Sequence, residues 1–155
     1  MWGQPRSWEP GDWSIPTGRP RVLIEDPDGA IRSTSERFLL REGFDVASCG
    51  GPEEMGRRAC PLLTTGSCTL TAGADMVYTS LRWHHPQSRE VLRALRVRHP
   101  RTPLVVEIPS PAAERLQEVL EGCHVVHMPV GRTAMVGAIR GALAQGLPGQ
   151  ATSPA

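Results

Sequence analysis

The chain has 155 residues, with 17 basic and 16 acidic side chains, and every basic residue is arginine because the sequence holds no lysine. Hydrophobic residues make up 39% and charged residues 21%, which is ordinary for a globular protein with one core. The net charge of +1 gives no electrostatic argument for a nucleic-acid partner. No apolar run approaches the roughly 18 residues of a membrane span, and no secretory signal opens the sequence. We therefore expect a cytoplasmic protein with reduced thiols.

Composition divides the chain into three parts. Residues 1–20 hold four prolines, three glycines and three tryptophans without a strand or helix period, which predicts an irregular arm. Three large aromatics in such an arm are expected to pack against this domain or a second subunit. Residues 21–145 carry the regular apolar patterning of a single domain. Residues 146–155 are predicted to be a disordered tail.

Within residues 21–145, short apolar runs alternate with segments of helical spacing. The predicted strands are residues 21–25, 44–48, 75–79, 103–108 and 123–127. The predicted helices are residues 31–41, 52–59, 88–98, 111–120 and 133–144. This alternation favours parallel βαβ units with right-handed crossovers. We predict a flavodoxin-like, doubly wound sheet of order 2-1-3-4-5, with its ligand site at the carboxyl ends of strands one and three.

Four segments of this pattern resemble the receiver domain of bacterial response regulators. They are RVLIEDPDGAIR (21–32), DMVYTSLR (75–82), RHPRTPLVV (98–106) and HMPV (127–130). In that family an acidic pair after strand one holds Mg²⁺, and an aspartate ending strand three accepts a phosphoryl group. In the same family, a hydroxyl residue at the end of strand four and a lysine before a cis-proline respond to the bound phosphoryl group. The resemblance implies a receiver fold and a role in two-component signal transduction.

The chain departs from the family at most of these positions. Asp26 keeps the first acid, Pro27 replaces the second, and Asp28 is a neighbouring acid. By the resemblance, the remaining pocket positions are the acceptor (Ser80), the hydroxyl residue (Ile108), the lysine (Met128) and the cis-proline (Pro129). A serine hydroxyl cannot form an acyl phosphate and is a poor nucleophile without an adjacent base. We therefore expect a pseudo-receiver that acts independently of phosphorylation, without a metal or cofactor.

The expected partner is a protein: a regulator, a sensor kinase or a second copy of the chain. The family's switch and dimer face corresponds here to Glu114, Gln117, Glu118, His127, Val130 and Arg132. A second expected contact is the loop Trp83-His84-His85-Pro86, whose aromatic and imidazole side chains we expect to be exposed to a partner or to form a surface turn. Adjacent histidines on an extended chain point to opposite sides, which argues against a metal site there.

Two further features leave alternatives open. Cys60 and Cys68 bracket a segment, residues 60–73, inserted between helix two and strand three; they are structural thiols, a reversible disulfide or metal ligands. Arg89, Arg93 and Arg96 share a helix face that is either solvated or able to bind phosphate, and the near-neutral charge favours the former. Nucleic acid is therefore not an expected partner.

The alternative function is a small-ligand or thiol-redox sensor on the same fold. Its site would be the carboxyl-end crevice with Asp26, Ser80 and Trp83, or the segment between Cys60 and Cys68. An enzyme of flavodoxin-like fold is disfavoured, because no glycine-rich phosphate loop follows strand one and no nucleophile–base pair is visible.

Overall fold

A computed structural model describes residues 13, 17–54 and 60–145 of the chain. Five parallel strands form one sheet of order β2-β1-β3-β4-β5, as the sequence predicts. The strands are β1 (Arg21–Glu25), β2 (Asp45–Cys49), β3 (Met76–Thr79), β4 (Leu104–Ile108) and β5 (His124–His127). All four strand pairs are parallel in register, so the carboxyl ends of the strands meet along one edge.

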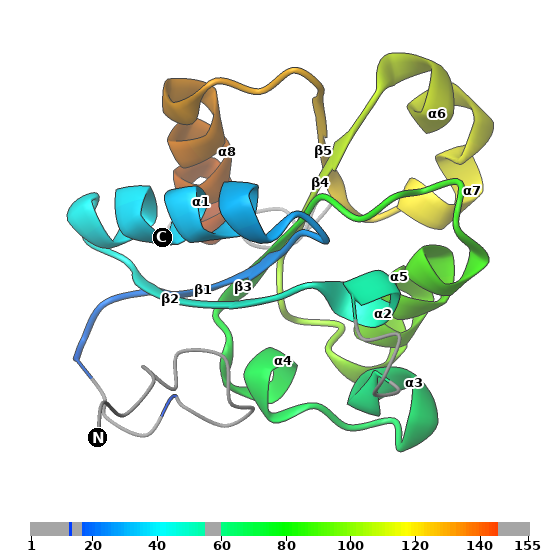
Figure 1. The fold of residues 1–155 in the computed structure, drawn as a ribbon, viewed down its shortest axis with the longest axis horizontal. Helices are drawn as coiled ribbons and strands as arrows, with labels where there is room; N and C mark the ends of the chain where they lie inside the picture. The colour runs from blue at the N-terminus through cyan, green and yellow to red at the C-terminus, as the bar shows by residue number, and fades with distance from the viewer. Residues whose placement is uncertain (1–12, 14–16, 55–59, 146–155) are drawn as a thin grey trace, which may run out of the picture.

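Helices cover both faces of this sheet (Figure 1). They are α1 (Gly29–Arg41), α2 (Gly51–Glu54), α3 (Pro61–Thr64), α4 (Thr69–Gly73), α5 (Pro86–Arg98), α6 (Ser110–Arg115), α7 (Gln117–Leu120) and α8 (Arg132–Gln145). α1 and α8 lie on one face, and α3, α4, α5 and α7 pack on the other. None of the described helices combines the length and apolar character needed to cross a membrane.

The two faces have separate hydrophobic cores, because successive strand residues point to opposite sides of the sheet. Val22 and Ile24 of β1 pack with Leu39 of α1 and with α8, whereas Leu23 packs with α5. The three inner strands are buried along nearly their whole length, as expected for a parallel sheet covered on both sides.

The helices differ from prediction at two places. The expected helix 111–120 is two helices, α6 and α7, because Leu116 leaves the helical conformation with φ −113° and ψ 23°. This break lets Leu116 and Leu120 both reach the core under α5. The expected helix 52–59 is described only as α2, since residues 55–59 lie outside the described residues.

The inserted segment 60–73 contains the short helices α3 and α4, each preceded by a cysteine. Leu62 and Leu70 of these helices are buried in the same core as Leu23, so the insertion extends this face of the domain. Of the predicted arm, only Trp13 and residues 17–20 are described, and the predicted tail 146–155 lies outside the described residues.

Trp13 docks the arm onto the inserted segment. Its indole Nε1 donates a hydrogen bond of 2.9 Å to the carbonyl of Leu70. The Arg21 guanidinium lies over the indole, 5.5 Å from the ring centroid, and donates to the Trp13 carbonyl. The indole lies so close to Gly73 that a β-carbon added there would overlap its Cδ1 atom. The absence of a side chain on Gly73 therefore makes room for this contact.

We expect Gly73→Ala to displace Trp13 and to destabilise the protein by about 1–2 kcal/mol, through loss of the indole hydrogen bond and the cation–π contact. Urea unfolding measures this change. The control is the same substitution in a Trp13→Ala background. There the overlap is gone, and alanine's better helix propensity should make Gly73→Ala neutral or slightly stabilising. An equal loss of stability in both backgrounds would contradict the docking of Trp13.

Candidate functional site

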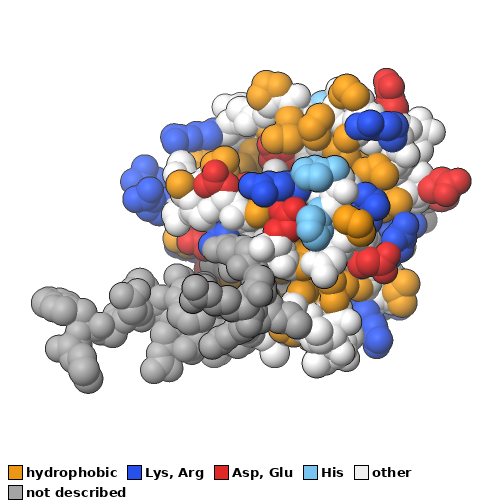
Figure 2. All heavy atoms as spheres, turned by 45° about the vertical axis from the view of Figure 1, so that its right-hand side comes forward, with side chains coloured by type: hydrophobic (Ala, Val, Ile, Leu, Met, Phe, Trp, Pro, Cys, Tyr) orange, Lys and Arg blue, Asp and Glu red, His pale blue; other side chains and the backbone are white. Residues whose placement is uncertain are grey.

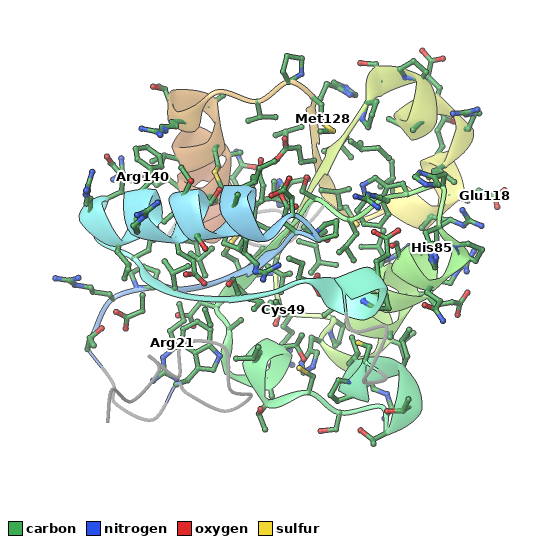
Figure 3. All side chains as sticks on the ribbon, in the orientation of Figure 1. Arg21, Cys49, His85, Glu118, Met128 and Arg140 are labelled. Atoms are coloured by element: carbon green, nitrogen blue, oxygen red, sulfur yellow. The ribbon has the colours of Figure 1, made fainter. Side chains whose placement is uncertain are left out.

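The sheet brings the predicted pocket residues to one edge. Backbone hydrogen bonds continue past the strand ends: Ser80 N donates to Glu25 O at 2.8 Å, and Met128 N donates to Ile108 O at 3.1 Å. Asp26 N likewise donates to the carbonyl of Cys49 at 3.1 Å. Met128, labelled in Figure 3, lies on the segment that follows β5. The predicted positions therefore sit at neighbouring strand ends, although they are far apart in sequence.

Asp26 is a largely buried acid, 8% exposed. Burial raises the pKa of Asp26; the hydrogen bond from Asp28 N to its Oδ1, 2.8 Å long, opposes this rise. The Asp28 carboxylate is already engaged as the N-cap of α1. Its Oδ1 accepts from Ala30 N at 2.9 Å and from Ile31 N at 3.1 Å. Asp28 therefore stabilises a helix start and does not complete an acidic pair.

The remaining pocket positions do not fit Mg²⁺ or a phosphoryl group. Pro27 has no donor atom in its side chain, Ser80 is half-buried, Ile108 is fully buried, and Met128 is 46% exposed. Mg²⁺ is usually held by one or two carboxylates together with phosphate oxygens, and here Asp26 is the single carboxylate at the family positions. Within the described ranges, no group of three or more His, Cys, Asp or Glu is arranged to hold a metal ion. The Met128–Pro129 peptide is cis, as the resemblance implies.

The expectation that Trp83 is exposed is wrong. Its side chain is 4% exposed, and its indole Nε1 donates to the Glu107 carbonyl at 3.1 Å. Arg89 Nη1 donates to the Trp83 carbonyl at 2.9 Å, so the loop is held from both β4 and α5. The indole contributes to the core on the α5 face. The loop therefore anchors the end of β3, and of its two histidines His84 is exposed and His85 is half-buried.

The residues of the predicted partner face lie in two separate parts of the structure. Four of its residues, Glu114, Gln117, Glu118 and His127, line a groove of about 730 Å³ between α6, α7 and β5. Glu118 lies on the outer side of α7 (Figure 3). Arg132 instead begins α8 and lies 5.4 Å from the centroid of the Phe38 ring, and the half-buried Val130 packs on the α1–α8 core. Glu121 adds a third acid to the groove, which makes it a negatively charged surface.

A second pocket, of about 560 Å³, lies between the loop after β3 and helix α6. Its lining residues are Ser80, Leu81, Arg82, Trp83, His84, Arg89, Pro109, Pro111, Ala112, Arg115, Leu116 and Met128. The sequence pointed to Ser80, Trp83, His84 and Met128 and placed Arg89 on a helix face with Arg93 and Arg96, but it did not bring Arg82, Arg89 and Arg115 together as one rim. Arg82, Arg89 and Arg115 belong to three separate elements, so no local spacing marks them.

Glu25 is a further residue that sequence analysis missed. It is 3% exposed and lies in register between Cys49 of β2 and Thr79 of β3, facing the α5 core. Burial raises its pKa to about 7, and the neighbouring Thr79 hydroxyl and Cys49 thiol lower it only partly. Its Oε1 has no hydrogen-bond partner among the described residues. An uncharged carboxylic acid is the form that this apolar site favours.

Burial also raises the pKa of three of the cysteine thiols. All four cysteines are free and half-buried. Burial raises the pKa of Cys60, brings that of Cys123 to about 11, and places that of Cys49 well above the ordinary value. The charges of Glu25, Cys68 and Cys60 raise the pKa of Cys49 further. A protonated thiol is a weak nucleophile, so this arrangement favours structural cysteines.

We expect stability to fall as the pH rises from about 5 to 8. Between the unfolded pKa of Glu25, 4.5, and its folded pKa of about 7, the folded chain binds more protons than the unfolded one. The protonated Glu25 therefore contributes its full stabilisation below the unfolded pKa, and this contribution is lost as the pH rises through the folded pKa. The free energy of unfolding should change by roughly 3 kcal/mol between these limits. Urea unfolding of Glu25→Gln across this range should show a shallower pH slope than wild type.

The matched control is Glu118→Gln, which changes an exposed glutamate in the same way. This variant should keep the slope of the wild-type protein, because a solvated carboxyl is not desolvated on folding. Identical slopes for Glu25→Gln and wild type would contradict the assignment.

Neither protein-family models nor curated proteins give a match to this chain. Solved structures, in contrast, do match this chain. A response-regulator receiver domain protein from Clostridium thermocellum is 18% identical, with a TM-score of 0.61 over 81% of this chain and 95% of that one. The fold is that of a receiver domain. An adenylate cyclase structure from Rhodopirellula baltica is 16% identical, with a TM-score of 0.61 over 82% of this chain and 89% of that one.

A chemotaxis response regulator of Vibrio cholerae is 17% identical, with a TM-score of 0.59 over 79% of this chain and 97% of that one. Identities this low show the receiver fold and leave the chemistry to the site residues. That two of these structures bear different activities in their names is consistent with one scaffold serving several functions.

Proposed function

We propose that this protein is a cytoplasmic signalling domain of receiver fold that works by binding another protein, without accepting a phosphoryl group. The supporting observation is Ser80 at the carboxyl end of β3, beside the single family carboxylate, Asp26. The proposed domain is not an enzyme and needs no cofactor. Its place would be in a two-component or transcriptional pathway, where receiver domains act as regulated binding modules.

The side chains at the edge support this proposal chemically. Phosphoryl transfer requires a nucleophile and positive charge that neutralises the transferring oxygens. Among the described residues, the Ser80 hydroxyl makes no hydrogen bond to a base, and Met128 supplies no charge at the family's lysine position. Asp26 is desolvated, so its pKa is raised, and protonation competes with a cation for this carboxyl group more than it would at an exposed one.

Wild-type protein incubated with acetyl phosphate and Mg²⁺ should show no mass increase of one phosphoryl group. The positive control is the triple variant Pro27→Asp/Ser80→Asp/Met128→Lys, which restores the acid pair, the acceptor and the lysine on the same backbone. Intact-mass spectrometry should detect a labile adduct in this variant alone. A phosphoryl group on Ser80 or Asp26 of the wild-type protein would refute phosphorylation independence.

The groove between α6, α7 and β5 is the proposed protein-binding surface. Glu114, Glu118 and Glu121 line it together with the exposed edge-strand residues Val125 and His127. Such a surface combines a negative rim with an apolar strip, which suits a partner carrying basic residues around an apolar one. Regulators, sensor kinases and a second copy of this chain all remain candidate partners under this proposal.

Affinity capture from the native host tests the groove. Wild-type protein should retain a partner that the charge-reversed variant Glu114→Arg/Glu118→Arg loses by about ten-fold or more, because like charges then face each other. Glu90→Arg, which reverses an exposed glutamate on α5, should retain the partner as wild type does. Retention of the same proteins by all three would exclude the groove as the binding surface.

A sensor of small ligands is the second candidate function. The pocket beside Ser80 supports it, because its volume of about 560 Å³ is within the range of ligand sites. The thiol-redox version has less support, since burial raises the pKa of Cys60 and so disfavours the reactive thiolate.

A further inference from the structure

The pocket beside Ser80 combines an apolar wall with a basic rim. Leu81, Trp83, Ala112, Leu116 and Met128 provide hydrophobic lining, and Pro109 and Pro111 complete it. Figure 2 turns the α5–α7 side of Figure 1 toward the reader and shows basic and histidine side chains directly beside hydrophobic ones. A ligand that fills this volume would cover apolar surface and meet positive charge at the same time.

The charge of the rim has one sign. Among the described residues, its titratable side chains are Arg82, Arg89, Arg115 and His84, and no Asp or Glu of these ranges lines the pocket. Arg82 is partly compensated from outside, because its Nε lies 3.8 Å from Glu53 Oε2. Arg115 is exposed and has no hydrogen bond or ion pair within the described part of the chain. At least one guanidinium is therefore available to an incoming anion.

Hydrogen bonds to backbone carbonyls hold two of the pocket's side chains, Arg89 and Trp83, without any ligand. Arg89 is held by its bond to the Trp83 carbonyl, which leaves its other N–H groups to act as donors. Trp83 is itself held by the Glu107 carbonyl. Pro109 and Pro111 restrict the backbone at the start of α6. A preformed site avoids part of the ordering cost of binding.

We propose that this pocket binds a small organic anion with an apolar ring or chain. The apolar body would lie on the hydrophobic wall, and a carboxylate, sulfonate or phosphate group would lie at the guanidinium rim. Guanidinium groups are planar donors that match such oxyanions. This site deepens the second candidate function by naming the ligand's chemistry. It does not rest on the proposed protein-binding function, so either can fail alone.

The probe is 8-anilinonaphthalene-1-sulfonate, which carries an aromatic body and one anionic group. Titration followed by fluorescence and by calorimetry should give a single site on the folded protein, with affinity that falls as salt rises. N-phenyl-1-naphthylamine, which has the same rings without the sulfonate, should bind at least about ten-fold more weakly. Inorganic phosphate, which has the charge without the rings, should also bind more weakly than the sulfonate dye.

Arg115→Ala should weaken binding of the sulfonate dye by about ten-fold, because it removes a charged donor. It should leave binding of the neutral amine unchanged. Arg101→Ala, an exposed arginine before β4 at the opposite edge of the sheet, is the matched control and should bind the dye like wild type. Circular dichroism checks that both variants stay folded.

Three results would overturn the proposal. They are no binding of the sulfonate dye by folded protein, equal affinity for the charged and neutral dyes, and equal loss of dye affinity in Arg115→Ala and Arg101→Ala. The proposal would also be overturned if adding the dye changed NMR chemical shifts only at residues away from α6 and the loop after β3.

Discussion

Parallel strand pairing is the constraint on which the rest of the structure depends. It brings the ends of β1, β3, β4 and β5 to one edge, and backbone hydrogen bonds extend the pairing to Asp26, Ser80 and Met128. Because the backbone makes these bonds, the positions of the site do not depend on which side chains occupy them. The chemistry of this edge is therefore free to change while its geometry stays.

Burial raises the pKa of the acidic residues near this edge. Burial is the largest cause of the raised pKa of Glu25, Asp26 and Glu107, and the Asp26 charge raises that of Glu107 further. Tyr78 donates a 2.7 Å hydrogen bond to Glu107 Oε2, which partly offsets the cost. At the family's lysine position the chain has Met128, which carries no charge. The positive charge instead lies on the rim formed by Arg82, Arg89 and Arg115.

The sheet order and the cis-proline were predictable because strand periodicity is local and the family segments come in order. Other features depend on the path of the chain in space. Trp83 is followed by two histidines and a proline, a pattern typical of a surface loop. Its indole is nevertheless buried and bonded to β4, while α5 binds its backbone carbonyl. Glu25 is one acid at the end of an apolar run, so its burial is visible only once Cys49 and Thr79 lie beside it.

Helix α6 stands between the pocket beside Ser80 and the acidic groove. Ala112 and Arg115 face the pocket beside Ser80, whereas Ala113 and Glu114 face the acidic groove. A shift or rotation of this one turn-and-a-half element changes the shape of both spaces. Any occupant that favours one orientation of α6 would thus alter the affinity of the other space, and thermodynamic reciprocity requires the same coupling free energy in either direction.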